Sequence, residues 1–150
     1  MDNEVDITAN KYAQVSFMGN QDLTDAGEEY KRIAIGSPAF QIQLFGFSFS
    51  GNKLIYQGEN KTCRAFLLAL VCHEGDQVER ELRVSIFKNG VPATESFGKV
   101  ISTGSNVFKA VSFETEISLS SGDEIEAVIY NSNGMEKVRV KDFKLAITSK

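Results

Sequence analysis

The residues from Leu82 to Gly90 read LRVSIFKNG, and their pattern indicates the class of the fold. Apolar and polar residues alternate in its first half. This is typical of a β-strand with one buried face, because neighbouring strand side chains point to opposite sides. The Asn89-Gly90 pair then predicts a tight hairpin turn, since both residues tolerate a positive φ angle.

The same alternation recurs along the chain, from Val111 to Leu119 and from Ile125 to Tyr130. The best helical candidate, Asp22 to Ile33, contains a glycine and lacks an apolar stripe. Short strands separated by polar turns therefore predict an all-β sandwich or barrel. The turn signals are Gly51-Asn52, Gly75-Asp76, Ser121-Gly122-Asp123 and Asn131–Gly134.

The parity of the apolar positions changes in two places. It moves from even to odd near Phe45 and Gly46, and again at Asp142, where Val138 and Val140 precede a run that starts at Phe143. A slip of one residue carries every later side chain to the other face. Each change therefore predicts a β-bulge or a bend.

The stretch from Ala65 to Cys72 is apolar on both faces. A strand in a simple sandwich hides one face only, and a long exposed apolar stripe is a liability. One interpretation is that another subunit covers the second face. The alternatives are a covering loop of the same chain and a short buried helix.

The start of the chain has a weaker pattern. Residues 1–10 are polar and acidic, and Lys11 to Met18 alternates weakly. We interpret residues 1–38 as an N-terminal arm or edge segment, which docks on a neighbour or runs along the sheet edge. Residues 39–150 are then the all-β domain. The chain has only two prolines and so no Pro-rich linker, which favours one domain and not two.

Composition excludes several classes of function. The 150 residues are 42% hydrophobic and 24% charged, as in a globular domain, and the net charge of −4 with scattered basic residues argues against nucleic-acid binding. The longest apolar run, Ala65 to Cys72, is far shorter than the roughly 20 residues of a membrane span. The acidic segment Met1 to Asp6 does not resemble a signal peptide. We expect a soluble protein that is made in a cytoplasm.

Cys63 and Cys72 stand nine residues apart. On one strand this is about 30 Å with opposite parity, too far for a disulfide. We therefore expect two free thiols that fill the core. With His73 they are too few for a typical zinc site, and no cofactor is expected.

The second half of the chain resembles the tumour necrosis factor-like jelly roll, which the globular heads of complement-type proteins share. The resemblance rests on Ala65–Cys72, on Leu82–Gly90, on Ile117–Glu126 with its ISLSSGDEIE sequence, and on the closing run Val138–Thr148. It covers roughly residues 40–148 and is nearest to versions found in bacteriophage structural proteins. It implies a two-sheet antiparallel jelly-roll sandwich without catalytic residues.

The resemblance also implies a compact homotrimer whose inner sheets pack around a threefold axis. It suggests a bacteriophage virion protein, either a capsid decoration (cement) or a head-fibre module. The partners would then be further copies of the chain and a capsid or fibre protein. The alternative is the head of a tail fibre that binds a host receptor or surface glycan. The residues expected at the trimer interface are Phe66, Leu68, Leu70, Cys72, Phe143 and Leu145.

Signals for other chemistry are weak. Glu114 and Glu116 are candidates for a glycan hydrolase, but they lie on what the pattern predicts to be a solvated face. Tyr56 and Tyr130 suit either a sugar-binding platform or cross-strand packing. Four acidic residues in or beside turns are candidate calcium ligands, although solvated turns account for them: Glu74, Asp76, Asp123 and Glu124.

Overall fold

The structure is a computed structural model, and it describes residues 12–23, 30–33, 41–75, 78–131 and 137–149. These residues form strands and connections, with no helix among them, so none of the described chain is a helix able to cross a membrane. The first sheet has five strands in the order β10 (Lys109–Leu119), β6 (Lys61–His73), β12 (Val138–Ser149), β1 (Tyr12–Leu23) and β3 (Gln41–Phe45).

The second sheet has seven strands. Five of them follow the order β4 (Phe47–Ser50), β5 (Lys53–Tyr56), β11 (Glu124–Asn131), β7 (Arg80–Lys88) and β8 (Val91–Pro92). The other two are β2 (Tyr30–Arg32), which pairs with β11, and β9 (Gly98–Ser102), which pairs with β7.

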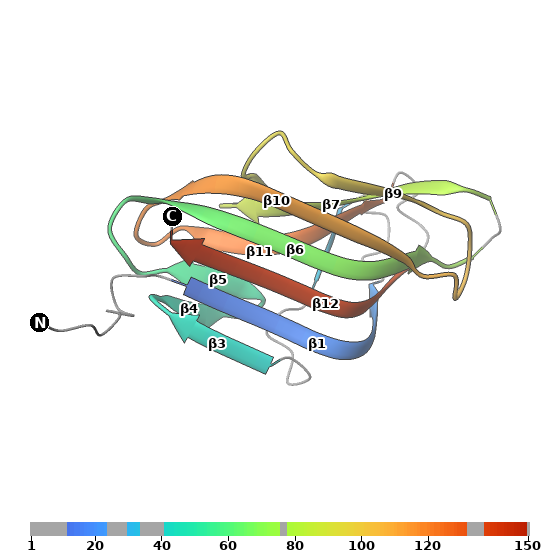
Figure 1. Ribbon diagram of the computed structural model, residues 1–150, viewed down its shortest axis with the longest axis horizontal. Helices are drawn as coiled ribbons and strands as arrows, with labels where there is room; N and C mark the ends of the chain where they lie inside the picture. The colour runs from blue at the N-terminus through green and yellow to red at the C-terminus, as the bar shows by residue number, and fades with distance from the viewer. Residues whose placement is uncertain (1–11, 24–29, 34–40, 76–77, 132–136, 150) are drawn as a thin grey trace, which may run out of the picture.

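The two sheets lie face to face (Figure 1), and every strand pairing is antiparallel. From β5 onward the chain crosses repeatedly between the sheets, because β6, β10 and β12 belong to one sheet and β7, β9 and β11 to the other. The expected all-β, two-sheet jelly-roll sandwich is confirmed.

The core fills the space between the sheets. The odd-numbered residues of β6 from Cys63 to Val71 are buried, as are Leu82, Val84 and Ile86 of β7. Each fully buried Leu, Ile or Val side chain contributes about 1.5–3 kcal/mol relative to exposure. The apolar side chains of the alternating pattern therefore also stabilise the fold, because they are the ones buried between the sheets.

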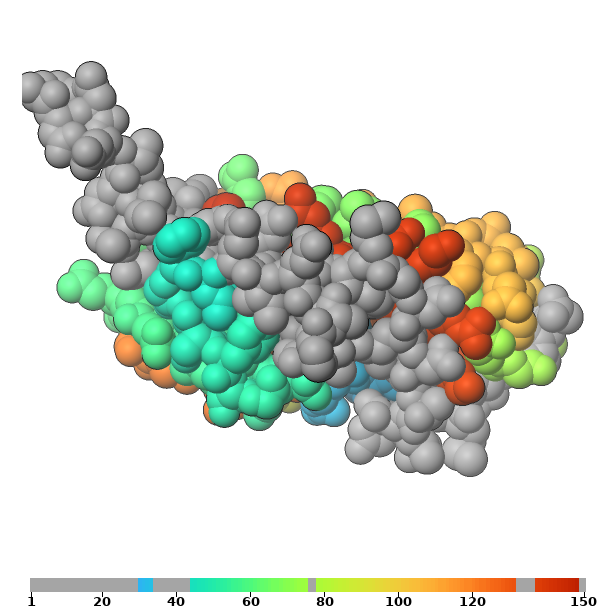
Figure 2. All heavy atoms as spheres, turned by 90° about the horizontal axis from the view of Figure 1, so that it is seen from below, coloured from blue at the N-terminus to red at the C-terminus, as the bar shows by residue number. Residues whose placement is uncertain are grey.

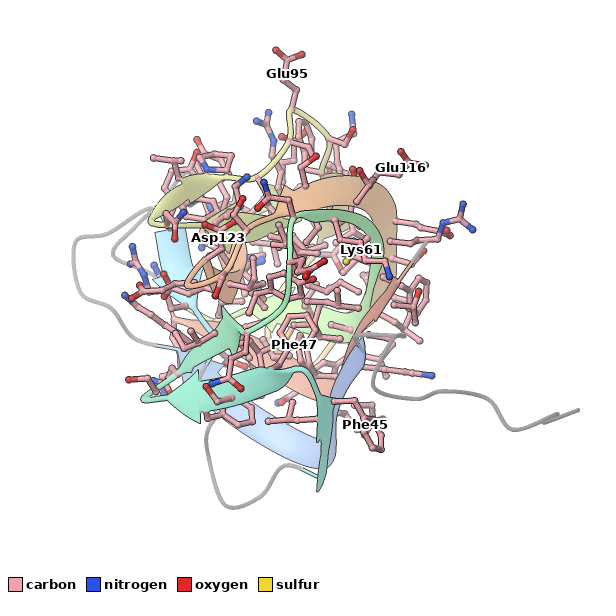
Figure 3. All side chains as sticks on the ribbon, turned by 90° about the vertical axis from the view of Figure 1, so that its left-hand side faces the viewer. Phe45, Phe47, Lys61, Glu95, Glu116 and Asp123 are labelled. Atoms are coloured by element: carbon pink, nitrogen blue, oxygen red, sulfur yellow. The ribbon has the colours of Figure 1, made fainter. Side chains whose placement is uncertain are left out.

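Both predicted irregularities occur. Gly46 adopts a φ of 77° and joins β3 in the first sheet to β4 in the second. Figure 3 accordingly shows Phe47 among the side chains between the sheets and Phe45 at the periphery. Asp142 has a φ of 51°, and the β6–β12 register shifts between Lys141 and Lys144, as a bulge requires.

The predicted Asn89-Gly90 hairpin is also present. Asn89 and Gly90 have φ angles of 54° and 84°, and the flanking strands pair Phe87 with Pro92. The Ser121–Asp123 turn has a different role, since it joins β10 in one sheet to β11 in the other.

The segment expected to be an arm contributes strands to both sheets. β1 lies between β12 and β3, and β2 pairs with β11. The domain limits at residues 38 and 39 stay a prediction. Viewed from below (Figure 2), the elongated molecule carries the teal β4–β5 hairpin toward one end and the yellow-orange β9–β10 connection at the other.

Candidate functional site

One candidate site is the outer face of the five-stranded sheet, where β6 presents its second apolar row. Phe66 and Leu70 are half-buried, and Leu68 keeps 38% of its surface exposed. Ala65 to Cys72 is a strand, so the helical interpretation of this stretch was wrong. Within the described chain, no loop fully covers the row.

The residues opposite this row on the neighbouring strands share its face. Ala146 of β12 lies opposite Phe66, and Lys144 lies opposite Leu68. On the other side, Ser112 of β10 lies opposite Leu68. The result is a short apolar row with a polar surround; at one end Arg64 Nε lies 3.3 Å from Glu114 Oε1.

Three of the residues expected at a trimer interface do not lie on this open row. Phe143 and Leu145 are buried in the core between the sheets, because the bulge at Asp142 keeps the apolar side of β12 turned inward. Cys72 is fully buried, with its Sγ 3.8 Å from Glu74 Oε1. The structure brings together Phe66, Leu68 and Leu70, and the interface itself stays a prediction.

The end of β6 holds a buried polar pair. His73 Nδ1 lies 2.7 Å from Ser102 Oγ, and the His73 backbone N–H donates to the same oxygen at 3.0 Å. Both residues have 0% exposure. Both side chains are sealed from solvent, whereas a catalytic nucleophile and its base must be reachable by the substrate. We therefore interpret the pair as structural.

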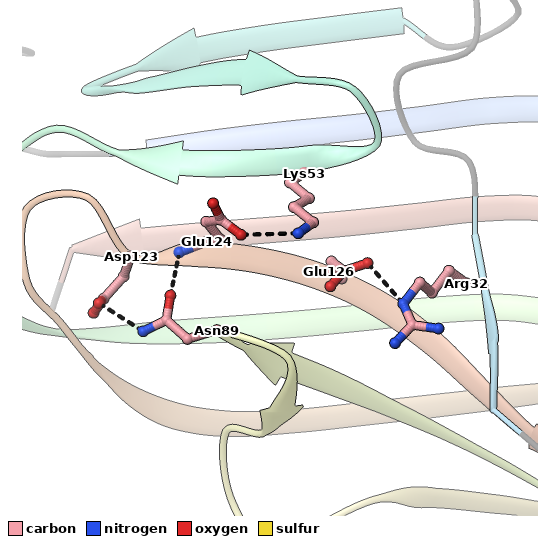
Figure 4. Close-up of polar contacts among 6 residues, drawn as sticks. All are labelled: Arg32, Lys53, Asn89, Asp123, Glu124 and Glu126. Carbon is pink, nitrogen blue, oxygen red and sulfur yellow. Dashed lines mark hydrogen bonds and ion pairs between the residues drawn. The ribbon is translucent and has the colours of Figure 1, made fainter.

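The acidic turn residues have protein partners. Asp123 accepts hydrogen bonds from Asn89 Nδ2 and from the Ser120 N–H, and Glu124 pairs with Lys53 at 2.9 Å (Figure 4). Glu74 pairs with Arg139 at 3.4 Å. Asp76 lies outside the described residues. No group of three or more potential metal ligands gathers in the part of the chain that the structure describes.

Glu114 and Glu116 are exposed on the outer face of β10, as the sequence predicted. Figure 3 shows Glu116 pointing away from the molecule. The two glutamates follow one strand face and do not oppose each other across the pocket described below. This is unlike the paired carboxylates that flank a scissile bond in glycosidases.

The second candidate site is a pocket of about 570 Å³ on the outer face of the seven-stranded sheet. Its floor comes from outward residues of β7 and β11, and the segment from Pro92 to Phe97 forms one wall. Aromatic rings line it. Tyr30 lies 5.2 Å from both Phe87 and Tyr130, centroid to centroid, with tilted planes.

A guanidinium group lies among these rings. Arg83 Cζ is 4.5 Å from the ring centroid of Phe97 and 5.3 Å from that of Tyr130. Arg83 Nε donates to Glu81 Oε2 at 2.6 Å, and Lys99 Nζ lies 4.0 Å from the other oxygen of Glu81. The pocket therefore combines an apolar aromatic wall with a cation.

Of the residues that line this pocket, only Tyr130 was a candidate from the sequence. Arg83 stands at a polar position of the alternating run that begins at Leu82, and Phe87, an aromatic residue of the same parity, was the available signal. Tyr56, the other aromatic candidate, is buried, packs 5.3 Å from Phe47 and donates its hydroxyl to the Glu59 carbonyl at 2.7 Å. Of the two roles considered for Tyr56, cross-strand packing is the one that the structure shows, since Phe47 and Tyr56 are partners in the β4–β5 pairing.

No protein-family model matches the sequence, and no curated protein matches it. Among solved structures, murine APRIL at pH 5.0 aligns with a TM-score of 0.60 and 11% identity over 94% of this chain and 99% of that chain. Eiger TNF from S. frugiperda aligns with a TM-score of 0.59 and 6% identity over 93% of this chain and 92% of that chain. The fold is therefore the tumour necrosis factor-like jelly roll.

Proposed function

We propose that this chain is a homotrimeric structural protein of a bacteriophage virion, acting as a capsid decoration or a head-fibre module. The observation that carries the trimer is the open apolar row of Phe66, Leu68 and Leu70 on the five-stranded sheet. An accessible apolar row on a sheet face is typical of a surface that a second copy covers. In the fold family that the sequence resembles, this sheet faces the threefold axis.

The virion location rests on the resemblance of the strand-and-turn motifs to bacteriophage structural proteins. In this role the chain binds other proteins of the virion and forms part of the particle, and it carries out no reaction. Its partners are two further copies of itself and a capsid or fibre protein, with neither nucleic acid nor a membrane among them.

Molar mass in solution tests the trimer. Size exclusion with light scattering should give 3 × 16.5 kDa, or 49.5 kDa. Leu68→Glu should shift the measured molar mass toward that of one chain, 16.5 kDa. The substitution would bury an unpaired charge of every subunit in the interface, which opposes association. Val91→Glu is the matched control, since Val91 is exposed on a hairpin of the other sheet. A wild-type monomer at high micromolar concentration would refute the trimer.

Mass spectrometry of purified phage particles tests the virion assignment. The chain should be present at a fixed ratio to the major capsid protein, and purified protein should cosediment with capsids that lack it. Its absence from particles that assemble normally would refute the virion role and leave the trimer intact.

A further inference from the structure

We propose that the aromatic pocket of the seven-stranded sheet binds a saccharide that carries a carboxylate, through Arg83. This inference does not rest on the trimer or on the virion role. The pocket faces away from the five-stranded sheet, because its floor residues point outward from β7 and β11.

The size and lining of the pocket suit a small cyclic ligand. Its volume of about 570 Å³ lies within the range of pockets that hold small molecules. Tyr30 is 41% exposed and Phe97 43%, Tyr130 is half-buried, and Phe87 is buried beneath Tyr30. A pyranose ring has an apolar face of C–H groups and a rim of hydroxyls, so it fits aromatic faces that end in polar groups.

Polar groups at the edge of these rings are available to the ligand. The hydroxyls of Tyr30, Tyr130 and Ser85 form no hydrogen bond with the described residues. They can therefore donate to and accept from sugar hydroxyls.

Arg83 supplies the charge. Among the described residues its only hydrogen bond runs from Nε to Glu81, which leaves the edge formed by its two terminal nitrogens for another carboxylate. A guanidinium held over an aromatic ring keeps its N–H donors in its own plane, where bidentate binding occurs. Arg83 and Lys99 balance the carboxylates of Glu81 and of Glu95, which also lines the pocket. Glu95 is exposed and extends away from the molecule (Figure 3), so Arg83 is the charged group among the rings.

Sheet pairing favours a saccharide over a peptide. Extended peptides usually add a strand to an unpaired sheet edge. Beneath the pocket, β7 pairs with β11 on one side and with β8 and β9 on the other. Recognition at this place therefore depends on side chains, as it does for a sugar.

Binding of the full chain to an array of uronic-acid and sialic-acid oligosaccharides tests the proposal. Each acidic saccharide is paired with its carboxyl-reduced counterpart, and hits are titrated by calorimetry. At least one acidic saccharide should bind. The affinity for its carboxyl-reduced counterpart should be lower by about tenfold or more. Binding to none, or equally to both members of a pair, would overturn the proposal, as would binding of acidic peptides alone.

Variants then place the ligand. Arg83→Gln and Arg83→Lys should both weaken binding, because lysine keeps the charge but loses the fork of donors. Phe97→Ala should weaken it about fivefold, whereas Val107→Ala, an equally exposed apolar residue outside the pocket, should change nothing. Circular dichroism melts confirm that each variant folds. Unchanged affinity in folded Arg83→Gln protein would overturn the assignment.

Discussion

The Asn89 side chain joins two turns by bonding to Asp123. Asn89 Nδ2 donates to Asp123 Oδ1 at 3.0 Å, while Asn89 Oδ1 accepts from the Glu124 N–H at 2.9 Å (Figure 4). The two backbones meet as well, since the Asn89 N–H donates to the Glu124 carbonyl at 2.8 Å. The β7–β8 hairpin is thereby fixed to the turn through which the chain passes from one sheet to the other.

Replacing Asn89 should separate the conformational and hydrogen-bonding roles of this residue. Asn89→Ala loses both side-chain bonds and puts alanine, which tolerates the left-handed region less well than asparagine, at a φ of 54°, so the free energy of unfolding should fall by about 2–3 kcal/mol. Asn89→Gly loses the bonds but tolerates the angle, so about 1 kcal/mol is expected. Urea unfolding at one fixed protein concentration measures both. Equal stability of the two variants would contradict the conformational part.

The same contact predicts a dependence on pH. Burial raises the pKa of Asp123, but the hydrogen bonds from Asn89 and the Ser120 N–H, with the charge of Lys88, more than offset burial, so the pKa is lowered overall. Its stabilisation is therefore present above the unfolded pKa of about 3.9 and is lost as the pH falls through the folded pKa. Asp123→Asn should be less stable than the wild type at pH 7, and the difference should shrink in acid. Glu95→Gln, at an exposed carboxylate, is the control.

Local pattern was enough to predict the long alternating strands and two of the bends, although not the short strands β2, β8 and β9. The parity changes near Gly46 and at Asp142 correspond to a crossing between sheets and to a bulge, because side-chain direction alternates with every residue. The Asn89-Gly90 turn was predicted from its φ preferences alone. These features depend on neighbours in sequence.

The pocket depends on pairing between distant strands and could not be predicted in this way. Tyr30 meets Tyr130 because β2 pairs with β11, and Arg83 joins them because β7 pairs with β11 on the other side. An alternating pattern gives the face of a strand but not its partner. Phe143 illustrates the same limit, since it was expected at a trimer interface and its side chain belongs to the core between the sheets.

Gly98 should resist substitution for reasons of space. An added Cβ would lie 2.7 Å from the Ser112 carbonyl oxygen and 3.0 Å from Val84 Cγ2. Since a backbone oxygen cannot rotate away, Gly98→Ala should lower the free energy of unfolding by about 1–3 kcal/mol. Gly51→Ala is an informative companion, because its Cβ would meet nothing within 4 Å and only its φ of 61° opposes the change. Thermal melts that rank Gly98→Ala as the milder variant would contradict the steric argument.

Phe143 and Leu68 should respond differently to truncation. Phe143→Ala removes a side chain that is 1% exposed in the core, so the free energy of unfolding should fall by about 3–5 kcal/mol. Leu68→Ala, at the open row, should leave the folding of one chain nearly unchanged and weaken association. Chemical unfolding and light scattering across a dilution series separate the two effects. If Leu68→Ala still assembles like the wild type but its free energy of unfolding falls, then Leu68 stabilises the single chain and not the association.

Cys63 and Cys72 should react slowly in the native protein. Both are free and fully buried, on opposite faces of β6. Burial is the main cause that raises the pKa of both thiols, which keeps them protonated and unreactive at neutral pH because the thiolate is the nucleophile. Iodoacetamide labelling followed by mass spectrometry should show almost no modification at pH 7.5 without denaturant, and two labels per chain in 8 M urea. Rapid modification of Cys72 in the native protein would show that the end of β6 opens separately from the core. Slow modification of both cysteines would show that the end of β6 unfolds together with the core.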